Sequence, residues 1–293
     1  MSFSWNLVAD LQEMWAYAFM RNAFEAGTII AIVAGIVGYF VILRRSAFAT
    51  HALGHTGFSG AAGAILFGVN PIYGLLLFTT ATGTGFALLG PRAARRDVEI
   101  GTVLAFALGV GLLFLSLYTG YATEAYSILF GEVLGISTGG VVFTLEASLA
   151  VLAVFALIYR PLLFASLDED VAEAKGMPML LLGVVFMILL AVTISIAVQV
   201  IGVLLIFALM VTPAAAAVRL TKRPLYAVVI SILVALSATW LGLFISWYEP
   251  YPVSFFIVSI TFGVYLAVRG GHALSGRLVR RSPASGRTVS PAE

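Results

Sequence analysis

Two histidines four positions apart, His51 and His55, are the side chains of this sequence best suited to bind a metal ion. They lie in a stretch that favours a helix, where residues four apart share one face with Cβ atoms roughly 5–6 Å apart. Two imidazoles at that spacing can contact one ion. His55 also follows Arg45 by ten residues, so a helix would carry it about 15 Å into a bilayer. Ionisable groups at that depth usually face a cavity or a transport pathway.

Two ligands do not complete a metal site, because zinc normally takes four. The remaining ligands would have to come from elsewhere in the fold, from a symmetry mate or from water. The alternative is a neutral histidine pair that makes hydrogen bonds inside a helix bundle. A membrane metalloprotease would need the pattern His-Glu-x-x-His, in which the glutamate is the general base. Ala52 follows His51 here, so the sequence disfavours hydrolysis.

The composition predicts that lipid surrounds the elements that carry these histidines. Hydrophobic residues make up 61% of the 293 residues and charged residues only 10%, against roughly 25% charged residues in a soluble domain. The long apolar runs favour helices over the short alternating strands of a membrane barrel. The sequence therefore predicts an all-α polytopic membrane protein. It has no cysteine, which excludes thiolate metal sites, and no basic stripe for nucleic acid.

Nine hydrophobic spans follow, each near or above the ~20 residues that a helix needs to cross a bilayer. They cover residues 22–43, 47–69, 71–90, 98–118, 141–160, 178–197, 199–218, 226–247 and 253–268. The turns near Pro71 and Gln199 are very short, so eight and ten spans are open alternatives. Residues 1–21 predict an N-terminal interfacial helix, 22–268 the transmembrane domain and 269–293 a disordered cytoplasmic tail.

The basic residues predict the orientation of the spans. They follow alternate spans, at Arg44, Arg45, Arg92, Arg95, Arg96, Arg160, Lys175, Arg219, Lys222, Arg223 and Arg269. With the N-terminus outside and the C-terminus in the cytoplasm, every cluster falls on the cytoplasmic side. The more polar segment 119–138 predicts an outer loop with a short interfacial or re-entrant helix.

An acidic stretch near residues 166–175 predicts a short cytoplasmic helix. Ser166 could cap its start, and acidic residues favour the N-terminal end of a helix dipole. No phosphate-binding G-x-x-x-x-G-K-[ST] motif occurs in the chain, so any ATP must bind a separate subunit. The stretch then becomes the natural docking element for that subunit, with a solvated loop helix as the alternative. The predicted docking residues are Asp168, Glu169, Asp170, Glu173, Lys175 and Gly176.

Five stretches occur in the order seen in one family. They read HALGHTGFSGAAGAILFGVNP, DVEIGTVLAFALGVGLLFLSLY, YATEAYSILFGEVLGIS, LDEDVAEAKGMP and QVIGVLLIFALMVTPAAAA. With them the chain resembles the integral-membrane permeases of bacterial zinc, manganese and iron ABC importers. The resemblance implies an inner-membrane permease that pairs with a second permease copy. It also implies cytoplasmic ATPase subunits, which the LDEDVAEAKGMP region contacts, and an extracytoplasmic metal-binding protein.

The resemblance also implies a role for the histidine pair. The family helix typically reads Ser-Asp-Ala-x-Ser-His-Ala, with Asp and His facing the transport path. His55 matches the histidine of that pattern, whereas His51 occupies the aspartate position. Imidazole in place of carboxylate shifts preference from Mn²⁺ towards Zn²⁺ or another borderline ion.

These observations lead to one hypothesis and two main rivals. The hypothesis is the permease subunit of an ATP-driven importer of divalent metal ions, with no permanently bound cofactor. His51 and His55 would bind the ion transiently while the permease dimer opens to each side in turn. The first rival is a permease for a metal chelate or a small organic solute. The second is a proton-coupled secondary transporter, which would need no ATPase.

Overall fold

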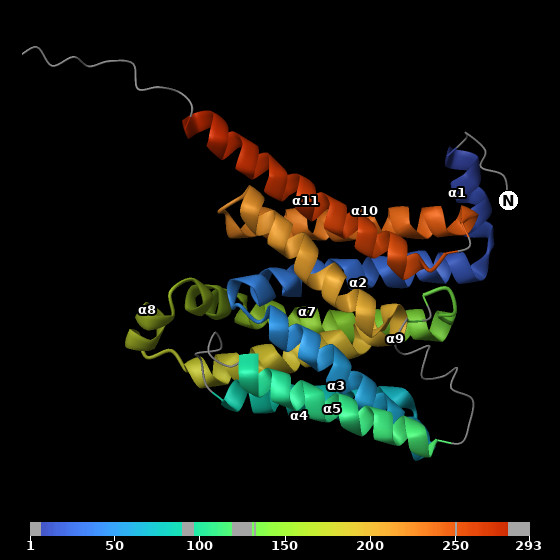
Figure 1. The fold of residues 1–293 in the computed structure, drawn as a ribbon, viewed down its shortest axis with the longest axis horizontal. Coiled ribbons are helices and arrows are strands. Elements are labelled where there is room, and N and C mark those ends of the chain that lie inside the picture. The colour runs from blue at the N-terminus through green and yellow to red at the C-terminus, as the bar shows by residue number, and fades with distance from the viewer. Residues whose placement is uncertain (1–6, 90–96, 119–130, 132, 250, 281–293) are drawn as a thin grey trace, which may run out of the picture.

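The computed structural model describes residues 7–89, 97–118, 131, 133–249 and 251–280, without the side chains of 7–9 and 272–280. All regular elements in these ranges are helices, as the composition predicts (Figure 1). They are α1 (Leu7–Ala16), α2 (Ala18–Leu43), α3 (Ala47–Leu66), α4 (Pro71–Leu88), α5 (Asp97–Leu117), α7 (Thr138–Leu167), α8 (Glu169–Ala174), α9 (Met179–Leu220), α10 (Pro224–Tyr248) and α11 (Val253–Arg280).

Helix α9 contains two membrane crossings joined at Gly202. As one straight helix its 42 residues would extend about 63 Å, twice the ~30 Å of a hydrocarbon core. Gly202 has φ 79° and ψ 166°, a conformation that side chains disfavour. Thr193 and Ile206 line one small pocket with Ile30, although thirteen residues of straight helix would span about 20 Å. The chain therefore folds back at Gly202, as its path in Figure 1 shows.

The number of crossings agrees with the prediction for the part of the chain that is described. Seven helices, α2, α4, α5, α7, α9, α10 and α11, are long and apolar enough to cross a membrane. The second half of α9 adds an eighth crossing. Helix α3, with 20 residues, adds a ninth, and it is packed inside the bundle. The turn predicted near Pro71 is present at Asn70, and the break predicted near Gln199 lies three residues later, at Gly202.

Some boundaries differ from those expected. The short N-terminal helix α1 ends at Ala16, and α2 begins at Ala18 with Tyr17 as its N-cap residue. Helix α11 continues to Arg280, well beyond the expected end of the last span at residue 268. The predicted outer helix within 119–138 falls largely on residues 119–130 and 132, outside the described residues, as does the tail beyond residue 280.

Helix α3 packs through a face of small residues. A Cβ atom on Gly60 would overlap the backbone of Gly74 in α4, and one on Gly74 would overlap Gly60. On the other side of α3, the backbone and side chain of Ser59 lie against Gly111 of α5. Such residues let helix backbones approach closely in a membrane. This face fixes the rotation of α3, and therefore the direction in which its histidines point.

The turn between α2 and α3 has a defined hydrogen-bond pattern. The backbone N–H of Arg45 donates to the carbonyl oxygen of Ile42, three residues earlier. That of Ser46 donates to the carbonyl oxygen of Val41, five residues earlier, at 2.8 Å. This is the pattern in which helices end with one left-handed residue, usually glycine. Arg45 takes that position with φ 55°. The turn is therefore well ordered, but it holds an arginine in a conformation that suits glycine.

We expect Arg45→Gly to stabilise the protein. The left-handed conformation costs a side-chain-bearing residue about 1–2 kcal/mol, and glycine avoids that cost. Thermal unfolding in detergent should show a higher midpoint for Arg45→Gly than for wild type. Arg45→Ala is the matched control, because it removes the same charge but keeps the Cβ atom. An equal midpoint for the two variants would contradict the proposed strain.

Candidate functional site

The histidine pair lies on one face of α3, as its spacing predicts. The ring centroids of His51 and His55 are 4.6 Å apart, with the ring planes at 78°. The ring of Phe207, from the second half of α9, lies 5.1 Å from that of His51. Both histidines are half-buried. Their rings are therefore close enough to bind one ion, beside an aromatic side chain from another crossing.

One ring nitrogen of the histidine pair has no hydrogen-bond partner among the described residues, so a purely structural role does not explain it. Nδ1 of His55 is buried and makes no hydrogen bond. A buried polar atom without a partner costs about 1–3 kcal/mol. Within the described ranges, no group of three or more histidine, aspartate or glutamate side chains could hold a metal ion. In the described part of the chain, the two imidazoles therefore stand without a third side chain of these types to complete a metal-binding group.

The rest of α3 is held firmly against its neighbours. The hydroxyl of Ser59 donates to the carbonyl oxygen of Ala107 in α5. A second buried hydrogen bond joins the neighbouring helices α4 and α9, between the hydroxyls of Thr79 and Ser195 at 2.7 Å. Leu53, between the histidines, is completely buried. Ser59 lies four residues after His55 and so shares its side of α3, and its hydrogen bond ties that side of the helix to α5.

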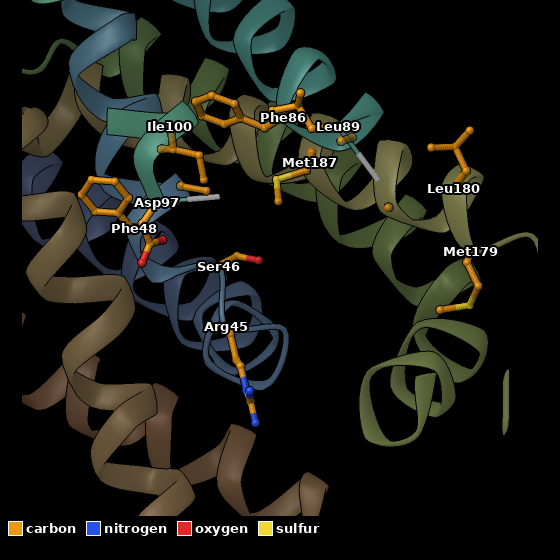
Figure 2. A pocket seen from close by; sticks show the side chains of 13 residues that line it. Arg45, Ser46, Phe48, Phe86, Leu89, Asp97, Ile100, Met179, Leu180 and Met187 are labelled. Carbon is orange, nitrogen blue, oxygen red and sulfur yellow. The ribbon is translucent and has the colours of Figure 1, made fainter. Parts of the chain in front are cut away.

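A separate pocket lies at the end of the bundle where α3 begins (Figure 2). Ser46 and Asp97 contribute polar side chains, while Phe86 and Met187 form an apolar wall. Neither histidine lines this pocket. Ala49 does, and it lies about 200° around the helix from His51. The pocket therefore belongs to a different face of α3 from the histidine pair.

The short helix α8 forms as the sequence predicts, with one correction. Its cap is Asp168, whose side-chain oxygen accepts a hydrogen bond from the backbone N–H of Val171 at 3.0 Å. Ser166 was expected to cap it and does not. It lies in the last turn of α7, where its hydroxyl donates to the carbonyl oxygen of Leu162 at 2.6 Å. Helix α7 continues to Leu167, so Ser166 lies inside it and bonds back to its own helix.

Helix α8 presents a charged surface at the end of the molecule opposite α1 (Figure 1). Ala172 is fully buried against Ala165 and Leu182, which anchors α8 to the helices on both sides. The ammonium of Lys175 lies 5.2 Å from the ring centroid of Phe164. The six predicted docking residues are all exposed: Asp168, Glu169, Asp170, Glu173, Lys175 and Gly176. Four carboxylates against one ammonium make this an acidic surface.

The acidic side chains of α2 and α7, Glu25 and Glu146, are exposed, and they form no group of three metal-binding side chains with the histidine pair. Phe207 beside His51 was not predicted, since nothing distinguishes it within its apolar stretch.

Comparison with known proteins identifies the family. The profile of the ABC 3 transport family matches residues 16–269. The chain belongs to this family. A manganese transport system membrane protein, MntC, of Halalkalibacterium halodurans is 30% identical over 220 residues, 74% of this chain and 75% of that protein. The manganese import system permease protein ScaB of Streptococcus gordonii is 29% identical over 238 residues, 81% of this chain and 85% of that protein.

The fold of this ABC 3 member also matches a solved structure. The structure of PsaBC from Streptococcus pneumoniae in complex with Fab has a chain that superposes with a TM-score of 0.79. The match has 26% identity and covers 89% of this chain and 95% of that chain. The chain is therefore a multi-pass membrane permease subunit rather than an enzyme, and ATP hydrolysis belongs to a separate subunit. The family resemblance noted in the sequence is confirmed.

The acidic surface of α8 gives a test of docking. We expect Asp170→Lys to slow association of the ATPase subunit several-fold, because reversing a charge at an interface mainly changes the association rate. Binding kinetics with the purified ATPase, at two salt concentrations, would measure this. Glu99→Lys is the matched control, because Glu99 is also an exposed acidic residue in the first turn of a helix. Equal effects of the two variants would remove α8 as the docking surface.

Proposed function

We propose that this chain is the permease subunit of an ATP-driven importer of divalent metal ions, with His51 and His55 as transient ligands. The observation that carries the proposal is the close pair of imidazoles on α3, 4.6 Å between centroids. One of its nitrogens is buried without a partner. Membership of the ABC 3 transport family supports a transport role. Relatives named for manganese transport support a metal ion as the cargo.

The donor atoms favour Zn²⁺ over Mn²⁺ or Fe²⁺. Imidazole nitrogen suits borderline ions such as Zn²⁺, whereas carboxylate oxygen suits the harder Mn²⁺. The relatives are named for manganese, but His51 stands here where the family pattern has an aspartate. Manganese is therefore the second candidate for the cargo, and a direct comparison of the two ions decides between them.

A second permease copy would complete the ligand set. Each chain supplies two imidazoles, and two copies that bring their α3 helices to a shared path would supply four, the usual number for zinc. A cytoplasmic ATPase would open the pair to each side in turn, and an extracytoplasmic binding protein would deliver the ion. In this arrangement the N-terminus lies outside and the end that carries Arg44 and α8 faces the cytoplasm, as the basic residues predict.

Uptake into vesicles tests the proposal. The vesicles should contain the permease, its ATPase and its binding protein, and should take up radioactive Zn²⁺ only with ATP. We expect His51→Ala combined with His55→Ala to lower uptake at least about tenfold, the loss that even outer-shell changes can cause at metal sites. The control is His272→Ala, which removes the third histidine of the sequence. Undiminished uptake by the double variant would refute the ligand assignment.

Metal preference can be tested at one position. We expect His51→Asp to raise uptake of Mn²⁺ relative to Zn²⁺, because a carboxylate is a harder ligand that also adds a negative charge to a low-dielectric site. Uptake of the two ions in competition gives the ratio. His51→Asn is the matched control, since it removes the imidazole without adding a charge. If both variants changed the ratio equally, the preference would not come from the donor atom at residue 51.

A further inference from the structure

Arg44 lies where α2, α7 and α9 meet, and the sequence indicated only its charge. It is the residue that ends α2, and its side chain is half-buried among helices. Its neighbour Arg45 is exposed and lines the pocket in Figure 2. A half-buried guanidinium needs partners to offset the loss of water. The question is therefore which elements provide these partners.

The partners come from the two helices that flank α8. On the α7 side, a guanidinium nitrogen of Arg44 donates to the hydroxyl of Ser166 at 3.4 Å. On the α9 side, the guanidinium carbon lies 5.3 Å from the ring centroid of Phe186. Gly183 of α9 also lies beside it, since a Cβ there would be 4.0 Å from a guanidinium nitrogen, an ordinary contact distance. One side chain thus touches both helices between which the docking helix is held.

Glu169 adds an electrostatic link to α8 itself. It is the first residue of α8, and its negative charge interacts favourably with Arg44. Arginine suits this position better than lysine would, because a planar guanidinium can lie on an aromatic ring while its N–H groups donate sideways. Any displacement of α8 with its flanking helices would therefore change the contacts of the Arg44 side chain.

The backbone of Arg44 connects the same residue to the histidines. The hydroxyl of Ser46 donates to the carbonyl oxygen of Arg44 at 3.2 Å. The hydroxyl of Thr50 donates in turn to the carbonyl oxygen of Ser46 at 3.0 Å. His51 is the next residue. The ordered turn between α2 and α3 therefore joins the Arg44 backbone to the first turn of the helix that carries the ligands.

We propose that Arg44 is a positioning residue that couples movement of the docking helix α8 to the histidine pair on α3. When α7, α8 and α9 move, the contacts of the guanidinium move Arg44 with them. The ordered turn then displaces the first turn of α3, which carries His51. This proposal rests on the proposed function, because it assumes that an ATPase acts on α8. It assigns to Arg44 a role in coupling ATP hydrolysis to transport, and none in binding the ion.

The test compares Arg44→Met, which keeps the length of the side chain without its charge, with Arg44→Lys and wild type. In the full complex we expect Arg44→Met to hydrolyse ATP at nearly the wild-type rate. Its uptake per ATP should fall at least about fivefold, the low end of typical allosteric coupling. Zn²⁺ binding by the permease should not change. Arg44→Lys should lie between the two, because it keeps the charge near Glu169. The control is Arg45→Gly, which removes the adjacent arginine and should transport normally.

A second measurement does not depend on the cargo. Hydrogen exchange of residues 47–55 in the complex should change when nucleotide binds the ATPase, and this response should disappear in Arg44→Met while α8 still responds. The proposal is overturned if uptake per ATP and the exchange response are unchanged. It is also overturned if Arg44→Met and Arg44→Lys both fail to assemble with the ATPase to the same extent, because Arg44 would then be needed only for folding. If wild type transports neither ion yet the exchange response requires Arg44, the cargo assignment fails and the coupling role stands.

Discussion

The structure depends on burying a polar helix inside a membrane protein. Helix α3 carries two histidines and several hydroxyl groups and is not among the helices apolar enough to cross by hydropathy alone. Polar groups in hydrocarbon are costly unless protein surrounds them. The mutual contact of Gly60 and Gly74 allows α4 to lie directly against α3, and Ser59 finds its acceptor on α5. Close packing of this kind surrounds the polar groups of α3 with protein, while His51 and His55 stay half-buried.

The fold could be predicted well because most of it follows from length and charge. Nine apolar runs and the alternation of basic loops favoured nine crossings over eight or ten, and the described helices agree. The reversal at Gly202 was harder, because no polar loop separates the two halves of α9 and only their combined length required a break. The end of α11 could not be predicted from hydropathy. A helix can continue past the apolar span when nothing in the sequence stops it.

The site could be predicted in part, for a similar reason. The spacing of His51 and His55 determines that they share a helix face, so local geometry was enough. Their neighbour Phe207 comes from a distant segment, and no local pattern identifies such a contact. The cap of α8 illustrates the competition between equivalent residues. Ser166 and Asp168 can both cap a helix, and Asp168 does so because α7 extends far enough to include Ser166.

An incomplete ligand set suits transport better than a complete one. Structural zinc sites with four ligands have apparent binding free energies of about 10–16 kcal/mol, which would make release slow. A pair of imidazoles on one helix binds weakly alone, and tight binding would require a second pair brought from a facing copy. Moving one α3 relative to the other would then change the number of ligands and hence the affinity. Helix α3 packs closely against α4 and α5, and the ordered turn at Arg44 connects it to the end of the bundle where α8 lies. If the histidines bind the ion as proposed, the position of this firmly packed helix, rather than the flexibility of its side chains, would control capture and release.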